Sequence, residues 1–163
     1  MEHETNLKAT MSRLVITEEQ QDQLDETLQT LLNATRGRSV MLIERSGLLL
    51  SSFGNEIANN IAISSLIAGI FKSITALSAL MGESEIRTMQ HRGSGTNLIL
   101  NLLESGDILA LMVTHQVEPK DYEAPVEGAI KILSPILIAA RDSTKKNTPY
   151  FGKDSISLIL GKL

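Results

Sequence analysis

The chain has 163 residues, a formal net charge of −4 at pH 7 and no cysteine. This length suits one hydrophobic core of ordinary size, so we expect a single domain with short extensions. The acidic charge, two Tyr, three Phe and no Trp argue against a nucleic-acid partner, and the lack of Cys excludes disulfides and thiolate chemistry.

The N-terminal segment, residues 1–16, is polar and acidic and lacks the basic and then apolar order of a secretory signal. We therefore expect a flexible segment on a cytoplasmic protein. Thr17-Glu18-Glu19-Gln20 has the form of a capping box, which predicts that a helix begins there. Apolar residues at helical spacing extend this first helix over about residues 18–35, namely Leu24, Leu28, Leu31 and Leu32.

A β-hairpin is predicted next, over residues 39–54. Two short β-prone runs flank Glu44-Arg45-Ser46-Gly47, whose glycine can take the positive φ angle of a tight turn. The run that follows, from Ile57 to Met81, contains only one charged residue, Lys72. It is long enough to cross a bilayer, but a charge near its centre costs about 2.5 to 3.5 kcal/mol on insertion, so we predict no membrane span.

This apolar run predicts a central helix, with Asn59 or Asn60 as its N-cap and Gly82 at its end. Its helical periodicity separates two stripes. The large aliphatic stripe consists of Ile63, Leu66, Ile67, Ile70, Ile74, Leu77 and Met81, and the small stripe of Ser65, Ala68, Gly69, Lys72, Ala76 and Ala79. We expect the large stripe to cover a sheet and the small stripe to admit a second helix or a partner. The alternative is that the small stripe is a solvated face.

Three strand-like runs follow, 85–92, 96–103 and 107–115, separated by glycine-containing turns. A last helix is predicted over 121–142, with Pro125 in its first turn and Pro135 kinking the helix or ending its first half. The predicted order α-ββ-α-βββ-α indicates a mixed α/β protein, more exactly one of the α+β class. We expect one five-stranded antiparallel sheet with helices on its faces.

Beyond a linker at 142–149, the C-terminal tail carries Ile156, Ile159, Leu160 and Leu163 on one face of a short predicted helix, which Asp154 or Ser155 could cap. A helix of this length is not stable alone, so it needs a surface on which to dock. We predict no catalytic group, no metal site and no cofactor. The three histidines, His3, His91 and His115, fall on separate elements, and no acid and base pair stands out.

Two stretches of this layout resemble the Roadblock family. "MLIERSGLLLSSFG" (41–54) is similar to its first hairpin, and "LIAGIFKSITALSALMGE" (66–83) is similar to its central helix. The resemblance covers about residues 18–142, which gives a Roadblock domain at 17–142 followed by a linker and apolar tail at 143–163. Within the family, the polar N-terminus, the linker and the apolar tail are most similar to bacterial MglB-type regulators of a Ras-like GTPase.

The resemblance implies a homodimer that pairs its third strands, here about 86–92, with the two central helices antiparallel on one face. The dimer interface would include Arg87, Met89, His91, Ala68 and Ala79. A small Ras-like GTPase of the MglA type would then bind at Ser65, Gly69, Lys72, Ser73, Ala76, Ile156, Ile159 and Leu160. In such proteins the regulator stimulates hydrolysis without inserting an arginine finger, which implies a non-catalytic GTPase-activating or co-regulatory protein acting in polarity or motility.

Two other functions stay open at this point. A Roadblock scaffold would tether a protein partner without affecting nucleotide turnover, and a small-ligand sensor would use a related sheet-and-helix layout. The sequence does not separate activation, exchange and tethering. It also leaves open whether the tail docks on the partner or on its own dimer.

Overall fold

The computed structural model describes residues 14–55, 59–83 and 85–147. The chain divides into two compact units, one of Ile16–Ile138 and the other of residues 1–15 with 139–163. The fold described below is that of the first unit. Most of the predicted flexible segment at 1–16, and the predicted tail helix, lie outside the described residues.

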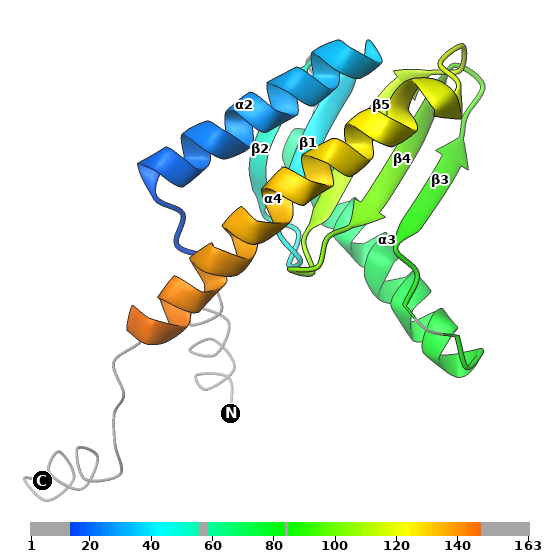
Figure 1. The fold of residues 1–163 in the computed structure, drawn as a ribbon. Coiled ribbons are helices and arrows are strands. Elements are labelled where there is room, and N and C mark those ends of the chain that lie inside the picture. The colour runs from blue at the N-terminus through cyan, green and yellow to red at the C-terminus, as the bar shows by residue number, and fades with distance from the viewer. Residues whose placement is uncertain (1–13, 56–58, 84, 148–163) are drawn as a thin grey trace, which may run out of the picture. The chain divides into compact units, whose positions relative to one another are not determined.

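The elements in chain order are α2 (Glu18–Thr35), β1 (Ser39–Ile43), β2 (Leu49–Gly54), α3 (Asn60–Leu80), β3 (Thr88–Arg92), β4 (Thr96–Leu102), β5 (Ile108–Thr114) and α4 (Pro119–Asn147). The five strands form one antiparallel sheet in the order β2-β1-β5-β4-β3 (Figure 1). The predicted element order and sheet are therefore confirmed.

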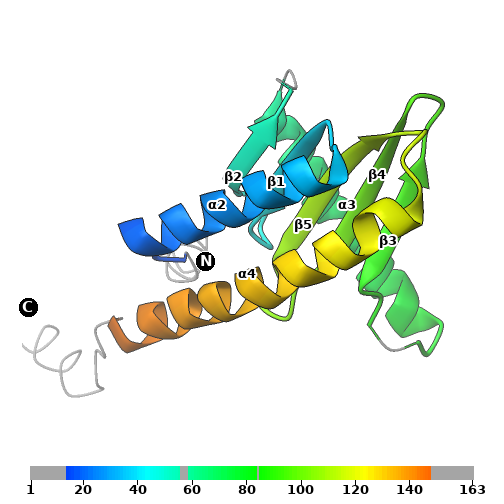
Figure 2. The same cartoon turned by 45° about the horizontal axis from the view of Figure 1, so that its top comes forward.

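Helices cover both faces of this sheet. Figures 1 and 2 show α2 and the first part of α4 on one face and α3 on the other. The two central strands, β1 and β5, are buried along almost their whole length, as strands covered on both faces should be. Since side chains alternate along a strand, Met41, Ile43, Ile108 and Ala110 pack toward α3, and their neighbours in sequence face α2 and α4.

The capping box predicted at the start of the first helix is present. The Thr17 hydroxyl accepts a hydrogen bond from the Gln20 amide at 3.1 Å, and the Gln20 side chain accepts one from the Thr17 amide at 3.0 Å. Two amides that the helix leaves without partners are thus satisfied.

Replacing Thr17 with alanine should cost about 1 kcal/mol of folding free energy, because the Gln20 amide loses its acceptor. For a chain of this size that lowers the melting temperature by about 2 to 4 °C, measurable by circular dichroism. Thr17→Ser keeps the hydroxyl and should melt close to the wild type. Equal melting of the alanine and serine variants would show that the cap contributes nothing.

The ends of α3 agree with the predicted signals only in part. Asn59 is the N-cap residue, but it lies in the left-handed region with φ of 67°, and its side chain makes no capping hydrogen bond. Gly82 follows the helix with φ of 70°, and the Glu83 amide donates to the Ser78 carbonyl at 2.9 Å. This pattern satisfies a terminal carbonyl of the helix, so Gly82 ends α3 as predicted.

Of the two outcomes predicted for Pro135, a kink or an end of the first half of the helix, the second is wrong, because α4 continues through Pro135. The predicted place of Pro125 in the first turn is also wrong, since α4 begins earlier, at Pro119. A proline removes one backbone hydrogen bond. Leu133 and Leu137, on either side of Pro135, are fully buried in the core. The packing of these leucines offsets the lost bond and keeps the chain helical.

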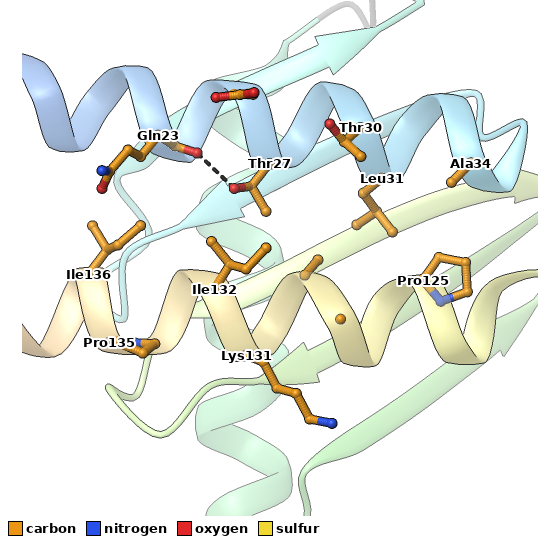
Figure 3. Close-up of a pocket in the computed structure, with 13 residues that line it drawn as sticks. Gln23, Thr27, Thr30, Leu31, Ala34, Pro125, Lys131, Ile132, Pro135 and Ile136 are labelled. Carbon is orange, nitrogen blue, oxygen red and sulfur yellow. Dashed lines mark hydrogen bonds between the residues drawn. The ribbon is translucent and has the colours of Figure 1, made fainter.

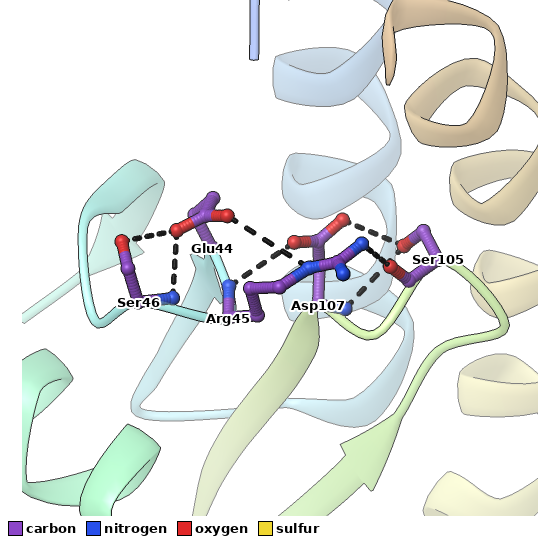
Figure 4. Close-up of polar contacts among 5 residues, drawn as sticks. All are labelled: Glu44, Arg45, Ser46, Ser105 and Asp107. Carbon is purple, nitrogen blue, oxygen red and sulfur yellow. Dashed lines mark hydrogen bonds and ion pairs between the residues drawn. The ribbon is translucent and has the colours of Figure 1, made fainter. Parts of the chain in front are cut away.

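A buried polar cluster joins the β1–β2 turn to the β4–β5 turn (Figure 4). Asp107, fully buried, accepts hydrogen bonds from the Arg45 amide at 3.2 Å and from the Ser105 hydroxyl at 2.6 Å. The Arg45 guanidinium donates to the Ser105 carbonyl at 2.5 Å, and Glu44 accepts from both the amide and the hydroxyl of Ser46. These bonds fix the two turns to each other at one end of the sheet.

Candidate protein-binding surface

The outer side of α3 and its C-cap residue carry six of the eleven large hydrophobic residues that are exposed among the described residues. Leu66 is 68% exposed, Leu77 50%, Leu80 87% and Met81 66%. Figure 1 shows that the C-terminal end of this helix extends past the sheet, where the sheet no longer covers it. Large exposed apolar side chains grouped in this way are typical of surfaces at which another molecule binds.

The inner side of α3 differs from the predicted division into stripes. The residues buried against the sheet are Ser64, Ile67, Ala68, Phe71 and Ser78, a mixture of the two stripes with residues that belong to neither. The expectation that the whole large stripe covers the sheet is therefore wrong. Phe71, Ile67 and the small Ala68 supply the α3 side of the core cluster.

This orientation exposes all five α3 residues that were predicted to bind a partner, namely Ser65, Gly69, Lys72, Ser73 and Ala76. A Cβ atom added at Gly69 would meet no other atom within 4 Å, so the helix surface there is open. Of the two α3 residues predicted in the dimer interface, Ala79 is exposed, but Ala68 packs into the core and is 2% exposed. Exposed leucines thus lie beside exposed small residues on one helix.

The third strand lies at an edge of the sheet, next to β4 alone in the strand order. Met89 packs partly into the core that α3 covers. His91, two residues further along the strand, shares that face and is exposed, and Arg87, directly before the strand, is also exposed. The predicted dimer residues Met89 and His91 therefore lie on the same side of the sheet as α3, with Arg87 directly before the strand, and β3 is an edge strand that could pair with another strand.

On the opposite face, β3 contacts α4. The Gln90 side chain donates to the Tyr122 hydroxyl at 2.9 Å. Burial, with a smaller contribution from the charge of Glu123, raises the pKa of this hydroxyl above its ordinary value. This contact holds β3 to α4 on that face of the sheet.

Two further features of the described residues bear on the chemistry of this surface. No group of three His, Cys, Asp or Glu side chains within residues 14–55, 59–83 and 85–147 is placed to hold a metal ion. The α3 helix is long and apolar enough to cross a membrane by length and composition, and about 28% of that stretch is buried in the domain. The predicted tail contacts, Ile156, Ile159 and Leu160, lie outside the described part of the chain.

Three solved structures share this arrangement. MglB from Myxococcus xanthus matches with a TM-score of 0.73 and 23% identity, covering 78% of this chain and 96% of that one. The gliding protein MglB from Thermus thermophilus matches with a TM-score of 0.72 and 22% identity, covering 78% and 97%. A Roadblock/LC7 domain from Streptomyces avermitilis matches with a TM-score of 0.63 and 19% identity, covering 70% and 97%.

Comparison at the level of sequence alone finds less. No protein-family model matches the chain, and no curated protein matches it. The similarity therefore lies in the arrangement of the helices and strands, which is conserved where only about a fifth of the residues are identical. The chain has the Roadblock-domain fold, in the form seen in MglB proteins.

Proposed function

We propose that this protein is a homodimeric, non-catalytic regulator of a small Ras-like GTPase of the MglA type. The observation that carries the proposal is the exposed apolar side of α3 on an MglB-like fold. A monomer would leave Leu66, Leu77 and Leu80 in water. Pairing of two α3 helices and two β3 edges would cover part of this surface and close the open edge.

The remaining exposed part of the two α3 helices is the proposed GTPase site. It carries Ser65, Gly69, Lys72, Ser73 and Ala76, which leave room for the backbone of a partner to approach closely. Ile156, Ile159 and Leu160 of the tail are proposed to contact the same partner. Binding would stimulate GTP hydrolysis by reshaping the switch region of the GTPase. We place this activity in the cytoplasm, where it would act in cell polarity or motility.

The proposal is tested with a small Ras-like GTPase recovered from the source cell. Single-turnover GTP hydrolysis should be faster in the presence of this protein than without it, and calorimetry should show one GTPase for each dimer. Binding with an unchanged hydrolysis rate would support a tethering scaffold instead. Absence of binding to any GTPase of that cell would refute the proposed partner.

Ala76→Arg should disrupt this surface without unfolding the domain. Ala76 is exposed, so the change should alter the melting temperature of an isolated subunit very little. At a closely packed contact a buried unpaired charge costs several kcal/mol, so dimerisation or GTPase binding should weaken by about 100-fold or more. Light scattering measures the loss of the dimer, and calorimetry measures the loss of GTPase binding. Gln29→Arg places the same charge at an exposed position of α2 and should leave both unchanged.

A further inference from the structure

The face of the sheet opposite α3 is hollowed on both sides of α4. The larger hollow, a groove of about 760 Å³, lies between α2 and α4 (Figure 3). Its charged lining residues are Glu26 and Lys131, and Lys131 is paired with Glu127 at 3.5 Å. Nothing in the described part of the chain indicates an occupant for this α2–α4 groove. The hollow on the other side of α4 has more specific chemistry.

This second hollow lies between α4 and the edge strand β3 and has a volume of about 310 Å³. It is lined from the sheet by Thr88, Gln90, Ile99 and Asn101, and from α4 by Tyr122, Glu123, Val126, Glu127 and Ile130. The hydrogen bond between Gln90 and Tyr122 lies at one side of it. Beyond this bond, Arg92 lines a separate hollow of about 280 Å³. The β3–α4 hollow therefore contains no cationic side chain of its own subunit.

Two carboxylates line the β3–α4 hollow. Glu123 and Glu127 are exposed and lie four residues apart, so they share one side of α4. Glu127 is paired with Lys131, which does not line this hollow. Glu123 forms no ion pair within residues 14–55, 59–83 and 85–147. The hollow thus has an excess of negative charge, which favours an occupant with positive charge.

The amide of Asn101 offers a hydrogen bond to such an occupant. Asn101 is 7% exposed, and its Nδ2 atom has no hydrogen-bond partner among the described residues. Its Oδ1 atom accepts from the Thr88 hydroxyl at 3.1 Å. Because the Thr88 hydroxyl can also accept, a half-turn of the amide keeps a bond to Thr88 and exchanges the positions of Oδ1 and Nδ2. The free end of this amide can therefore accept a hydrogen bond from a cation.

A second copy of the chain carries a cation that fits this hollow. The edge strand β3 has five residues, Thr88–Arg92. Antiparallel pairing of all five with a second copy places Gln90 opposite its own counterpart and Thr88 opposite Arg92 of the partner subunit. Opposite residues point to the same face, with Cβ atoms about 4.5 to 5.5 Å apart. Arg92 is exposed and forms no ion pair in the described ranges, so its long side chain is available.

We propose that, in the homodimer, Arg92 of each subunit occupies the β3–α4 hollow of the other. The guanidinium would pair with Glu123 and Glu127 and donate to the Asn101 amide oxygen, while its aliphatic stem lies along Val126. Two-fold symmetry forms this contact twice in each dimer. The inference rests on the proposed pairing of β3 edges and adds what selects the register. A shift of the strands would move each Arg92 away from the hollow, so the contact also fixes how the two α3 helices lie relative to each other.

Charge reversal at the two ends of this contact provides the test. Arg92→Glu and Glu123→Arg each bring like charges together in their homodimers, so each should weaken dimerisation by about tenfold or more. A mixed dimer of the two variants has opposite charges at both contacts. With one variant labelled with ¹⁵N, native mass spectrometry should find mixed dimers as about four-fifths or more of all dimers, against the half expected for random pairing.

This mixing experiment responds only to contacts between subunits, because a pair within one chain is the same in mixed and unmixed dimers. Glu26→Arg reverses an exposed charge on α2 and should pair at random with Arg92→Glu. Random pairing of Arg92→Glu with Glu123→Arg would overturn the proposed contact and leave the homodimer standing. A wild-type chain that is monomeric in light scattering would instead refute the homodimer, and the contact with it.

Discussion

Replacing Gly54 with alanine should destabilise the domain by about 3 to 5 kcal/mol and lower its melting temperature by about 6 to 20 °C. Gly54 ends β2 with φ of 111°, a conformation that residues with a Cβ atom rarely adopt. An added Cβ would lie 2.3 Å from the Arg38 carbonyl oxygen and 2.6 Å from the Ser39 Cα. Both contacts are with backbone, so no rotation of a side chain can relieve them.

The surrounding hydrogen bonds prevent the backbone from yielding. The Arg38 carbonyl accepts from the Asn55 amide at 2.8 Å, and the Arg38 amide donates to the Met112 carbonyl at 2.8 Å. Gly69→Ala is the matched control, since its Cβ enters open space on a helix and should stabilise the domain by up to about 1 kcal/mol. Thermal and urea unfolding measure both changes. Similar stability of the two variants would mean that the backbone around Gly54 can move to accommodate a Cβ atom, contrary to the expectation.

Replacing Asp107 with alanine should cost about 3 kcal/mol, the second large effect. The change leaves the Arg45 amide and the Ser105 hydroxyl without their acceptor inside a buried cluster. It also removes a negative charge near the Arg45 guanidinium, whose own bond to the Ser105 carbonyl depends on the same two turns. Urea unfolding should show a lower midpoint with little change in slope.

Asp107→Asn provides the comparison for this prediction. The amide oxygen can still accept one of the two hydrogen bonds, so the loss should be smaller than for alanine. Glu104→Ala changes an exposed carboxylate in the same β4–β5 turn and should alter stability by less than about 0.5 kcal/mol. An equally small loss of folding free energy for Asp107→Ala and Glu104→Ala would show that the polar cluster does not hold the two turns together.

Local signals in the sequence predicted the elements of this fold well. The capping box placed the start of α2 at Glu18, and the run of leucines carried it to Thr35, as the structure has it. Glycines in the turns marked the hairpins, because Gly47 and Gly106 have the positive φ angles of 101° and 86° that those turns require. Short connections between strand-like runs then favour an antiparallel sheet, so the topology followed from the spacing of the turns.

The orientation of α3 could not be predicted in the same way. Its residues are apolar on nearly all sides, so periodicity gives no clear direction for the sheet. Which side faces the sheet depends on how Phe71 and Ala68 fit against Met41 and Ile108, a property of tertiary packing. The α2–α4 groove was missed for a related reason. Gly128 lines this groove between α2 and α4, and a single glycine in a helical pattern gives no sign of what lies opposite.

Substitutions of the exposed leucines of α3 should give different results in two kinds of mutational screen. Leu66, Leu77 and Leu80 contribute little to the core of one subunit, so polar substitutions there should pass a screen that measures only the amount of folded protein. A screen that requires assembly or partner recognition should reject many of the same substitutions. Positions such as Leu109 and Leu133, which are fully buried, should fail both screens. The pattern of tolerated changes along this one helix would therefore map the surface that its partners cover.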